Sequence, residues 1–306
     1  MSDTLESLRR KIDGATELDS VVRTMKALAA SSIVQYERAV RSLDDYYRTV
    51  ELGLVAWLYQ ENVKQGAAIY TSGDARKNKG ATGAVVFGSD QGLVGQFNEV
   101  IADFAVGKLG AMPGDKQVFA VGERVQGRLA DAALPVTANF SVPNSIASIT
   151  PLVRTILIEI EKQRVQGKVA EVYLFHNRPI SGAVYEPVMQ RLLPLDVTWE
   201  RGLSELEWPT ANLPEVIAGG EATLQALVRE YLFISLFRAC AESLASENAS
   251  RLAAMQRAEK NIDELLEDLN QDFHQLRQSS IDAELFDVVS GFEAMKADKA
   301  QSTRGM

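Results

Sequence analysis

The stretch from Glu221 to Ser290 contains neither glycine nor proline, and it constrains the fold more than any other feature of the chain. Glycine and proline cost about 1 and 3 kcal/mol in a helix interior, so their absence predicts one continuous helix. At about 1.5 Å per residue, this helix would be on the order of 100 Å long. A compact domain cannot bury such a length, so the helix must pair with another helix or insert into a partner.

Apolar residues recur along this helix at steps of three and four, and the same spacing marks the N-terminal region from Leu5 to Trp57. Residues at this spacing line one side of a helix and form a seam along which a second helix can pack. The C-terminal seam comprises Leu252, Met255, Glu259, Ile262, Leu266, Leu269, Phe273 and Leu276. In the N-terminal seam only Asp19 and Lys26 are polar. A period of 3.5 predicts a left-handed coiled coil. We expect the two termini to pair as one antiparallel coiled coil; the alternative is two segments that each dimerise with other chains.

The middle of the chain has a different period and predicts an α/β domain. Short apolar runs predict strands at Ala84–Phe87, Gln117–Val121, Val169–Phe175 and Val188–Leu195. Helical segments are predicted at Gln96–Leu109, Glu123–Ala130 and Ile146–Gln166. This alternation is typical of a mostly parallel sheet. The predicted division is a coiled-coil helix at 1–62, an α/β domain at 80–200, a coiled-coil helix at 212–292, linkers at 63–79 and 201–211, and a tail at 293–306.

Composition excludes several classes of function. The net charge of −9 argues against nucleic acid as the main partner. One cysteine cannot form an internal disulfide or a cysteine-rich metal site, and two histidines leave little for zinc. We expect His176 to lie in a turn after a strand and His274 to be a solvated helix side chain. The longest apolar runs are far shorter than the roughly 20 residues of a membrane span. A soluble, cytoplasmic protein without metal or cofactor is expected.

A glycine-rich turn containing Gly88, Gly92 and Gly95 follows the first predicted strand. Such a turn before a helix can cradle phosphate. Its spacing is not that of a dinucleotide motif, and the Lys-Ser/Thr of a P-loop is absent. Glu123 fits a ribose-binding acid only loosely. A structural turn is therefore favoured, with a nucleotide-binding enzyme bearing coiled-coil arms, or a purely structural coiled-coil scaffold, as the alternatives.

Four stretches resemble one family when they are taken together. Met25–Ser31 resembles M-K-M-V-A-A-S, and Ser89–Gly95 with Asn98 resembles S-D-R-G-L-C-G…N. Ser246–Met255 resembles S-E-x-x-x-R-M-x-A-M, and Arg277–Gly291 resembles R-Q-A-(A/S)-I-T-x-E-L-x-E-I-V-(S/G)-G. Across essentially its whole length the chain resembles the γ subunit of rotary F-type ATP synthases. Departures at Gln91, Val94, Gln256 and Asp282 suggest a divergent bacterial form.

The resemblance implies a fold and a function. The fold would be a long antiparallel coiled coil of the terminal helices with an inserted Rossmann-like α/β domain. The protein would be the non-catalytic central rotor stalk of F1, coupling ion flow to ATP synthesis or hydrolysis. Its partners would be three α and three β subunits, the ε subunit and the membrane c-ring. It would lie peripherally at the cytoplasmic face of the bacterial inner membrane, and no catalytic, cofactor-binding or metal-binding residue is expected.

The resemblance also assigns residues by motif position. Rotor contacts to the catalytic subunits would come from Met25, Lys26, Arg277, Gln278 and Ile281. The bearing tip at the far end would comprise Leu285, Val288, Val289 and Phe292. The turn with Gly88, Gly92 and Gly95 would be a structural corner.

Overall fold

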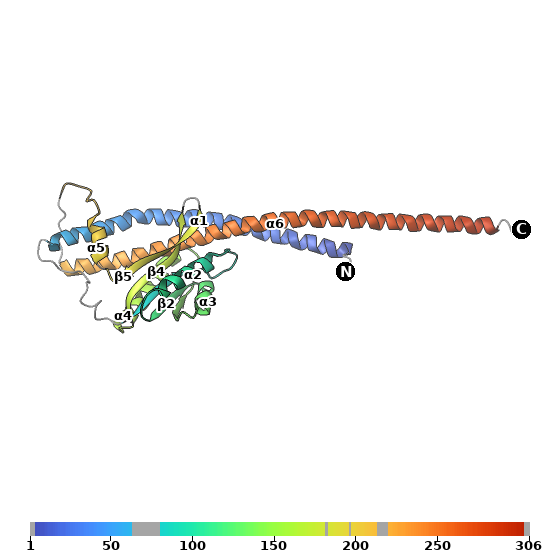
Figure 1. The fold of residues 1–306 in the computed structure, drawn as a ribbon. Coiled ribbons are helices and arrows are strands. Elements are labelled where there is room, and N and C mark those ends of the chain that lie inside the picture. Colours follow the sequence, from blue (N-terminus) through green and yellow to red (C-terminus); the bar gives the residue numbers. More distant parts are fainter. Residues whose placement is uncertain (1–3, 63–79, 181–182, 196, 213–219, 303–306) are drawn as a thin grey trace. The chain divides into compact units, whose positions relative to one another are not determined.

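A computed structural model describes residues 4–62, 80–180, 183–195, 197–212 and 220–302 (Figure 1). The chain divides into two compact units: Met1–Ala27 with Met255–Met306, and Leu28–Ala254. Helices α1 (Leu5–Asn62) and α6 (Gly220–Ser302) pass through both units. The predicted loop at 65–79 lies outside the described residues. Helix α6 continues past residue 292, where the sequence predicted its end; the single Gly291 weakens the helix without breaking it.

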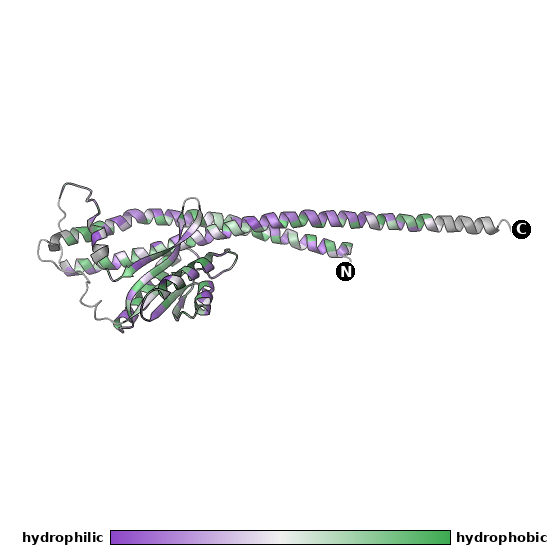
Figure 2. Ribbon diagram, in the orientation of Figure 1, coloured by the Kyte–Doolittle hydropathy of each residue, from purple (hydrophilic) through white to green (hydrophobic). Residues whose placement is uncertain are grey.

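The first unit is an antiparallel pair of helices. Leu8 and Ala15 of α1 and Met255 and Leu269 of α6 are buried, and all four are predicted seam positions. The helices run in opposite directions, because Lys26 pairs with Glu259 whereas Arg23, one turn earlier, also reaches Asp263. This confirms the predicted antiparallel coiled coil. Figure 2 shows the hydrophilic middle of α6 giving way to a hydrophobic stretch near its end.

The second unit contains a five-stranded sheet in the order β3-β2-β1-β4-β5. Its strands are β1 (Ala81–Phe87), β2 (Lys116–Val121), β3 (Val136–Phe140), β4 (Val169–Ile180) and β5 (Ala183–Leu193). The first four are parallel, and β5 pairs antiparallel with β4. The prediction of a mostly parallel sheet is therefore confirmed. Strand β1 is buried along its whole length, as expected for a central parallel strand covered on both faces.

Helices cover both faces of this sheet. On one face, α2 (Phe97–Gly110) and α3 (Glu123–Asp131) pack on Ala84 and Val86 of β1. On the other, α4 (Ile146–Val165), α1 and α6 pack on Val85 and Phe87. The alternation of side chains along a strand explains why successive residues enter different cores. Among the described residues, no helix is long and apolar enough to cross a bilayer.

Two elements and one turn differ from the sequence prediction. Strand β3 and helix α5 (Val197–Ser204) were not predicted. The turn predicted at His176–Pro179 was wrong, because β4 continues to Ile180 and pairs with β5. Asn177 is buried there: its side-chain amide donates to the Phe97 carbonyl, and its own carbonyl accepts from Ser246 Oγ. These bonds satisfy polar groups that would otherwise favour a turn.

Candidate functional site

The polar positions of the two seams meet in the first unit. Lys26 Nζ lies 2.5 Å from Glu259 Oε2, and both side chains are mostly covered, with exposed fractions of 34% and 20%. Arg23 Nε lies 2.9 Å from Asp19 and 3.6 Å from Glu259. The interacting carboxylates raise the pKa of Arg23, the Asp19 hydrogen bond most of all. Charges in one seam therefore face opposite charges in the other, which favours a single pairing register.

An exposed apolar stretch lies near the C-terminal end of α6. Leu285, Phe286 and Val288 have exposed fractions of 62%, 73% and 70%. Ile281 and Val289 are exposed as well. The side chain of Phe292 lies outside the described residues. Because large apolar side chains gathered on one surface are costly in water, this stretch is a candidate for contact with a partner.

The predicted contact residues fall at two levels of α6. Lys26 pairs at the level of Glu259, and Met25 beside it is half-buried. Arg277 and Gln278 are exposed, about 27 Å further along the helix at 1.5 Å per residue. The structure therefore does not gather these residues into one site. His274, next to this pair, is exposed as predicted.

The turn at Gly88–Gly95 is held by internal hydrogen bonds. Asn98 Oδ1 accepts from the Ser89 N–H, and Asn98 Nδ2 donates to Ser89 Oγ. The Asp90 carboxylate accepts from the backbone N–H groups of Glu123 and Val142. A Cβ on Gly88 would lie 2.3 Å from Val125 Cβ, so glycine is required there by close packing.

This arrangement is unsuited to phosphate. In a phosphate cradle, free N–H groups at a helix N-terminus face the anion. The helix that follows the turn is α2, and the Asp90 carboxylate of the turn accepts from the N–H of Glu123 at the N-terminus of α3. Its negative charge within the turn disfavours a second anion there. Gly95 has a φ of +58°, which glycine adopts without strain.

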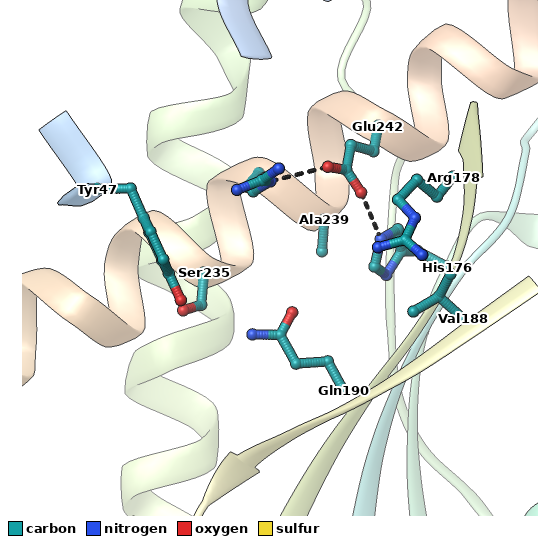
Figure 3. A pocket seen from close by; sticks show the side chains of 9 residues that line it. Tyr47, His176, Arg178, Val188, Gln190, Ser235, Ala239 and Glu242 are labelled. Carbon is teal, nitrogen blue, oxygen red and sulfur yellow. Dashed lines mark hydrogen bonds and ion pairs between the residues drawn. The ribbon is translucent and has the colours of Figure 1, made fainter. Parts of the chain in front are cut away.

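A polar cluster connects the sheet to both long helices in the second unit; His176 and Glu242 are buried in it, whereas Arg238 and Asp44 are partly exposed. Figure 3 shows Glu242 of α6 with its contact to His176 of β4. His176 Nε2 and Arg238 Nε each lie 2.8 Å from the Glu242 carboxylate, and Arg238 also pairs with Asp44 of α1 at 3.2 Å. Burial alone would raise the pKa of Glu242. The contacts with His176 and Arg238 outweigh burial and lower this pKa below its usual value.

This cluster does not form a catalytic triad. A triad places a nucleophile on one imidazole nitrogen and a carboxylate on the other. His176 Nε2 contacts the carboxylate, and Nδ1 has no hydrogen-bond partner among the described residues. The adjoining cavity of about 190 Å³ is also lined by Tyr47 and Gln190. The geometry ties β4 to α6 and α1. Within the described part of the chain, no group of three or more metal-ligating side chains occurs.

Comparison with known proteins identifies the family. A sequence model of the family described as ATP synthase matches residues 4–295. The chain belongs to the ATP synthase family.

The curated relatives of this ATP synthase family member match along nearly their whole length. The ATP synthase gamma chain of Clostridium pasteurianum is 26% identical over 97% of this chain and 100% of its own. The ATP synthase gamma chain of Polaromonas naphthalenivorans is also 26% identical, over 95% of this chain and 99% of its own. Both support the predicted resemblance to the gamma chain, which the family match confirms.

Solved structures share the fold. A Euglena gracilis mitochondrial ATP synthase rotor chain aligns with a TM-score of 0.61 at 15% identity, covering 90% of this chain and 98% of that one. A chain from the central stalk and c-ring of the Tetrahymena thermophila enzyme aligns with a TM-score of 0.53 at 21% identity, covering 78% and 99%. At 15% and 21% identity, these matches show that the chain shares the fold of those two chains.

Sequence reasoning on this ATP synthase family member missed three features. Phe286 was not named among the four bearing-tip residues, although it adjoins Leu285 and is exposed. Arg23 lies one turn from Lys26, and that spacing could have revealed the charged network. The hydrogen bond between His176 and Glu242 joins residues 66 positions apart, which no local pattern reveals.

Proposed function

We propose that this chain is the central rotor stalk of the F1 part of an ion-translocating ATP synthase. Rotation of the stalk would couple ion flow through a membrane ring to ATP synthesis or hydrolysis on the α/β hexamer. The observation that carries the proposal is the helix pair of the first unit, which ends in an exposed apolar stretch on α6. The full-length match to gamma chains supports it.

The physical requirements of a rotor agree with this helix pair. A shaft transmits torque only if it is stiff, and two helices with interlocked seams are stiffer than one. The charged network of Arg23, Lys26 and Glu259 opposes sliding of one helix along the other. A shaft must also have unequal faces so that each orientation presents a different surface to the ring, and α1 and α6 differ in sequence. The role is mechanical, and the chain itself catalyses no reaction.

The proposed partners follow from the relatives. Neighbouring structures are described as a rotor, as central stalk with c-ring, and as OSCP, F1 and c-ring. By analogy, this chain would contact three α and three β subunits, an ε subunit and a c-ring. It would lie peripherally on the membrane, at the cytoplasmic face of a bacterial inner membrane.

The proposed contacts divide between two sets. Rotor contacts to the catalytic subunits would come from Met25, Lys26, Arg277, Gln278 and Ile281. The bearing tip would comprise Leu285, Val288, Val289 and Phe292, to which we add the exposed Phe286. The Gly88–Gly95 turn would be a structural corner, since Asp90 and Asn98 hold it together.

Reconstitution with separately purified α and β subunits tests the proposal. The chain should co-elute in size-exclusion chromatography at three α, three β and one copy of itself, with cooperative ATP hydrolysis. Arg277→Ala and Gln278→Ala should lower the hydrolysis rate several-fold, because charge-assisted contacts made during rotation are lost. Arg124→Ala, which removes an exposed arginine from α3, is the matched control and should leave the rate unchanged.

Two outcomes would contradict the rotor proposal. Elution as a separate homodimer would favour a coiled-coil scaffold. Nucleotide protection of the Gly88–Gly95 turn in hydrogen exchange, together with turnover by the chain alone, would favour a nucleotide-binding enzyme.

A further inference from the structure

A groove in the second unit lies between α4 and α6, and nothing in the rotor proposal uses it. Its volume is about 520 Å³, within the range of about 300–1,000 Å³ that is typical of small-molecule sites. Leu193 and Leu195 are buried at its base, and Val228 of α6 is buried beside them. Ile158 of α4 is 69% exposed in the wall. The interior is therefore largely apolar and open to water.

The rim of the groove is positively charged although the whole chain carries a charge of −9. Three arginines line it, Arg154 and Arg164 on α4 and Arg229 on α6, with Glu161 as the acid among the lining residues. Arg164 pairs with Glu161 at 3.5 Å. Arg154 and Arg229 are exposed and have no ion-pair partner within the described part of the chain. Two guanidinium groups are thus available to an anion above an apolar floor.

The length of the groove suits an extended hydrocarbon chain. From Arg154 to Arg164 the α4 wall is about 15 Å long at 1.5 Å per residue. A single hydrocarbon chain can lie along the leucine floor.

We propose that the α4–α6 groove binds the anion of a long-chain carboxylic acid. The hydrocarbon chain lies on Leu193, Leu195 and Val228, and the carboxylate accepts hydrogen bonds from the arginine rim. Guanidinium groups suit this role because their planar donors match the geometry of a carboxylate. The inference rests on the groove alone and is independent of the rotor proposal.

Isothermal titration of the full-length chain with dodecanoate, below its micelle-forming concentration, tests the proposal. Saturable one-site binding is expected. Butanoate, which keeps the carboxylate but lacks most of the chain, should bind at least about tenfold more weakly. Dodecylammonium, which has the chain with the opposite charge, should show no saturable one-site binding when it is titrated alone.

Variants locate the site. Arg154→Glu and Arg229→Glu should each weaken dodecanoate binding by roughly fivefold or more, because attraction becomes repulsion. Ile158→Glu should also weaken it, and the exposed position makes unfolding no concern. The matched control is Arg124→Glu on α3, with the same change of charge outside the groove, and it should bind as the parent does.

Three results would overturn the proposal. The first is the absence of saturable dodecanoate binding. The second is equal weakening by Arg124→Glu and Arg229→Glu, or no weakening by any groove variant, which would place binding elsewhere. The third is sedimentation of the chain with anionic phospholipid vesicles without binding of dodecanoate, which would make the occupant a membrane surface.

Discussion

One helix, α6, meets two different environments along its length. In the second unit, every residue from Ile234 to Glu247 except Arg238 is buried. In the first unit, Leu269 is the one buried residue between Gln256 and Ser280. The buried portion is rich in small and apolar residues, such as Ala239, Cys240 and Ala241, because other elements surround it. The other portion carries a single apolar stripe.

The difference shows that one continuous helix can serve two mechanical purposes. A helix that is buried on nearly every side is held by a core, whereas one with a narrow apolar stripe is held by one partner helix. The second unit can therefore anchor α6 firmly. In the first unit, most of the surface of α6 stays free for contacts with other subunits.

Truncation of one leucine in each environment should show the largest contrast. Leu236→Ala, in the fully buried portion, should lower the free energy of unfolding by about 3 kcal/mol, because a cavity remains in a packed core. Leu276→Ala, at a half-buried seam position, should lower it by about 1 kcal/mol, because water reaches the site. Urea denaturation followed by circular dichroism measures both changes. Equal losses would contradict the distinction between the two portions.

Two glutamates only five positions apart should respond oppositely to pH. Burial and the neighbours His176 and Arg238 together leave the pKa of Glu242 lowered. Burial, opposed by Arg251, raises the pKa of Glu247. A lowered pKa stabilises the fold above the ordinary value of 4.5, and this stability is lost as the pH falls through the folded-state pKa. A raised pKa has the opposite sign: the fold gains stability as the pH falls.

The measurement is the unfolding free energy of Glu242→Gln and Glu247→Gln between pH 7 and about pH 2, a range that extends below the ordinary pKa of 4.5 to include the lowered pKa of Glu242. At pH 7, Glu242→Gln should cost about 1–3 kcal/mol, because hydrogen bonds to a charged group are lost. Glu247→Gln should cost less, since ionisation of Glu247 is itself unfavourable there. The cost of Glu242→Gln should shrink toward low pH. A cost that does not depend on pH would show that the ionised carboxylate is not what stabilises the contact.

Removing the ion pair of Lys26 with Glu259 in the first unit should change the stability of the fold less than it changes the register in which α1 pairs with α6. Lys26→Met alone should cost about 1 kcal/mol, because Glu259 loses its closest partner. Lys26→Met combined with Glu259→Leu should be neutral or stabilising, because an apolar pair replaces an ion pair. Disulfide trapping between introduced cysteines should then detect shifted pairings of α1 with α6. If the double variant still showed a single pairing of α1 with α6, apolar packing alone would be enough to set the register.

Periodic features of this chain could be predicted from sequence, and contacts between distant residues could not. The seams follow from their 3.5 period, and even the polar exceptions Lys26 and Glu259 were visible before their pairing was known. Strand β3 was missed because its five residues form a short, half-exposed edge without a continuous apolar run. His176 was assigned to a turn because its partner, Glu242, lies far away in sequence.

The candidate sites divide in the same way. The residues near the C-terminal end of α6 were assigned from their motif, and the structure shows that Leu285 and Val288 are exposed there. Their contact with a partner stays a prediction. The α4–α6 groove could not be predicted from the sequence. Its walls come from two segments more than 60 residues apart, one with Arg154 and the other with Arg229, and neither segment carries a motif. Packing places these residues together, and packing is what single-sequence reasoning lacks.

Glycines within α1 offer the finest comparison of the two units. A Cβ on Gly14, in the first unit, would meet nothing within 4 Å, whereas one on Gly53, in the second, would lie 2.9 Å from Leu227 Cδ2. Gly14→Ala should therefore raise the free energy of unfolding by about 0.5–1 kcal/mol, which is the helix preference of alanine. Gly53→Ala should gain less, because Leu227 must move, and Gly53→Val should be destabilising. Thermal unfolding of the three variants measures the order. If Gly53→Ala gained as much as Gly14→Ala, α1 and α6 would not be in close contact at Gly53, and the tighter packing assigned to the second unit would be wrong there.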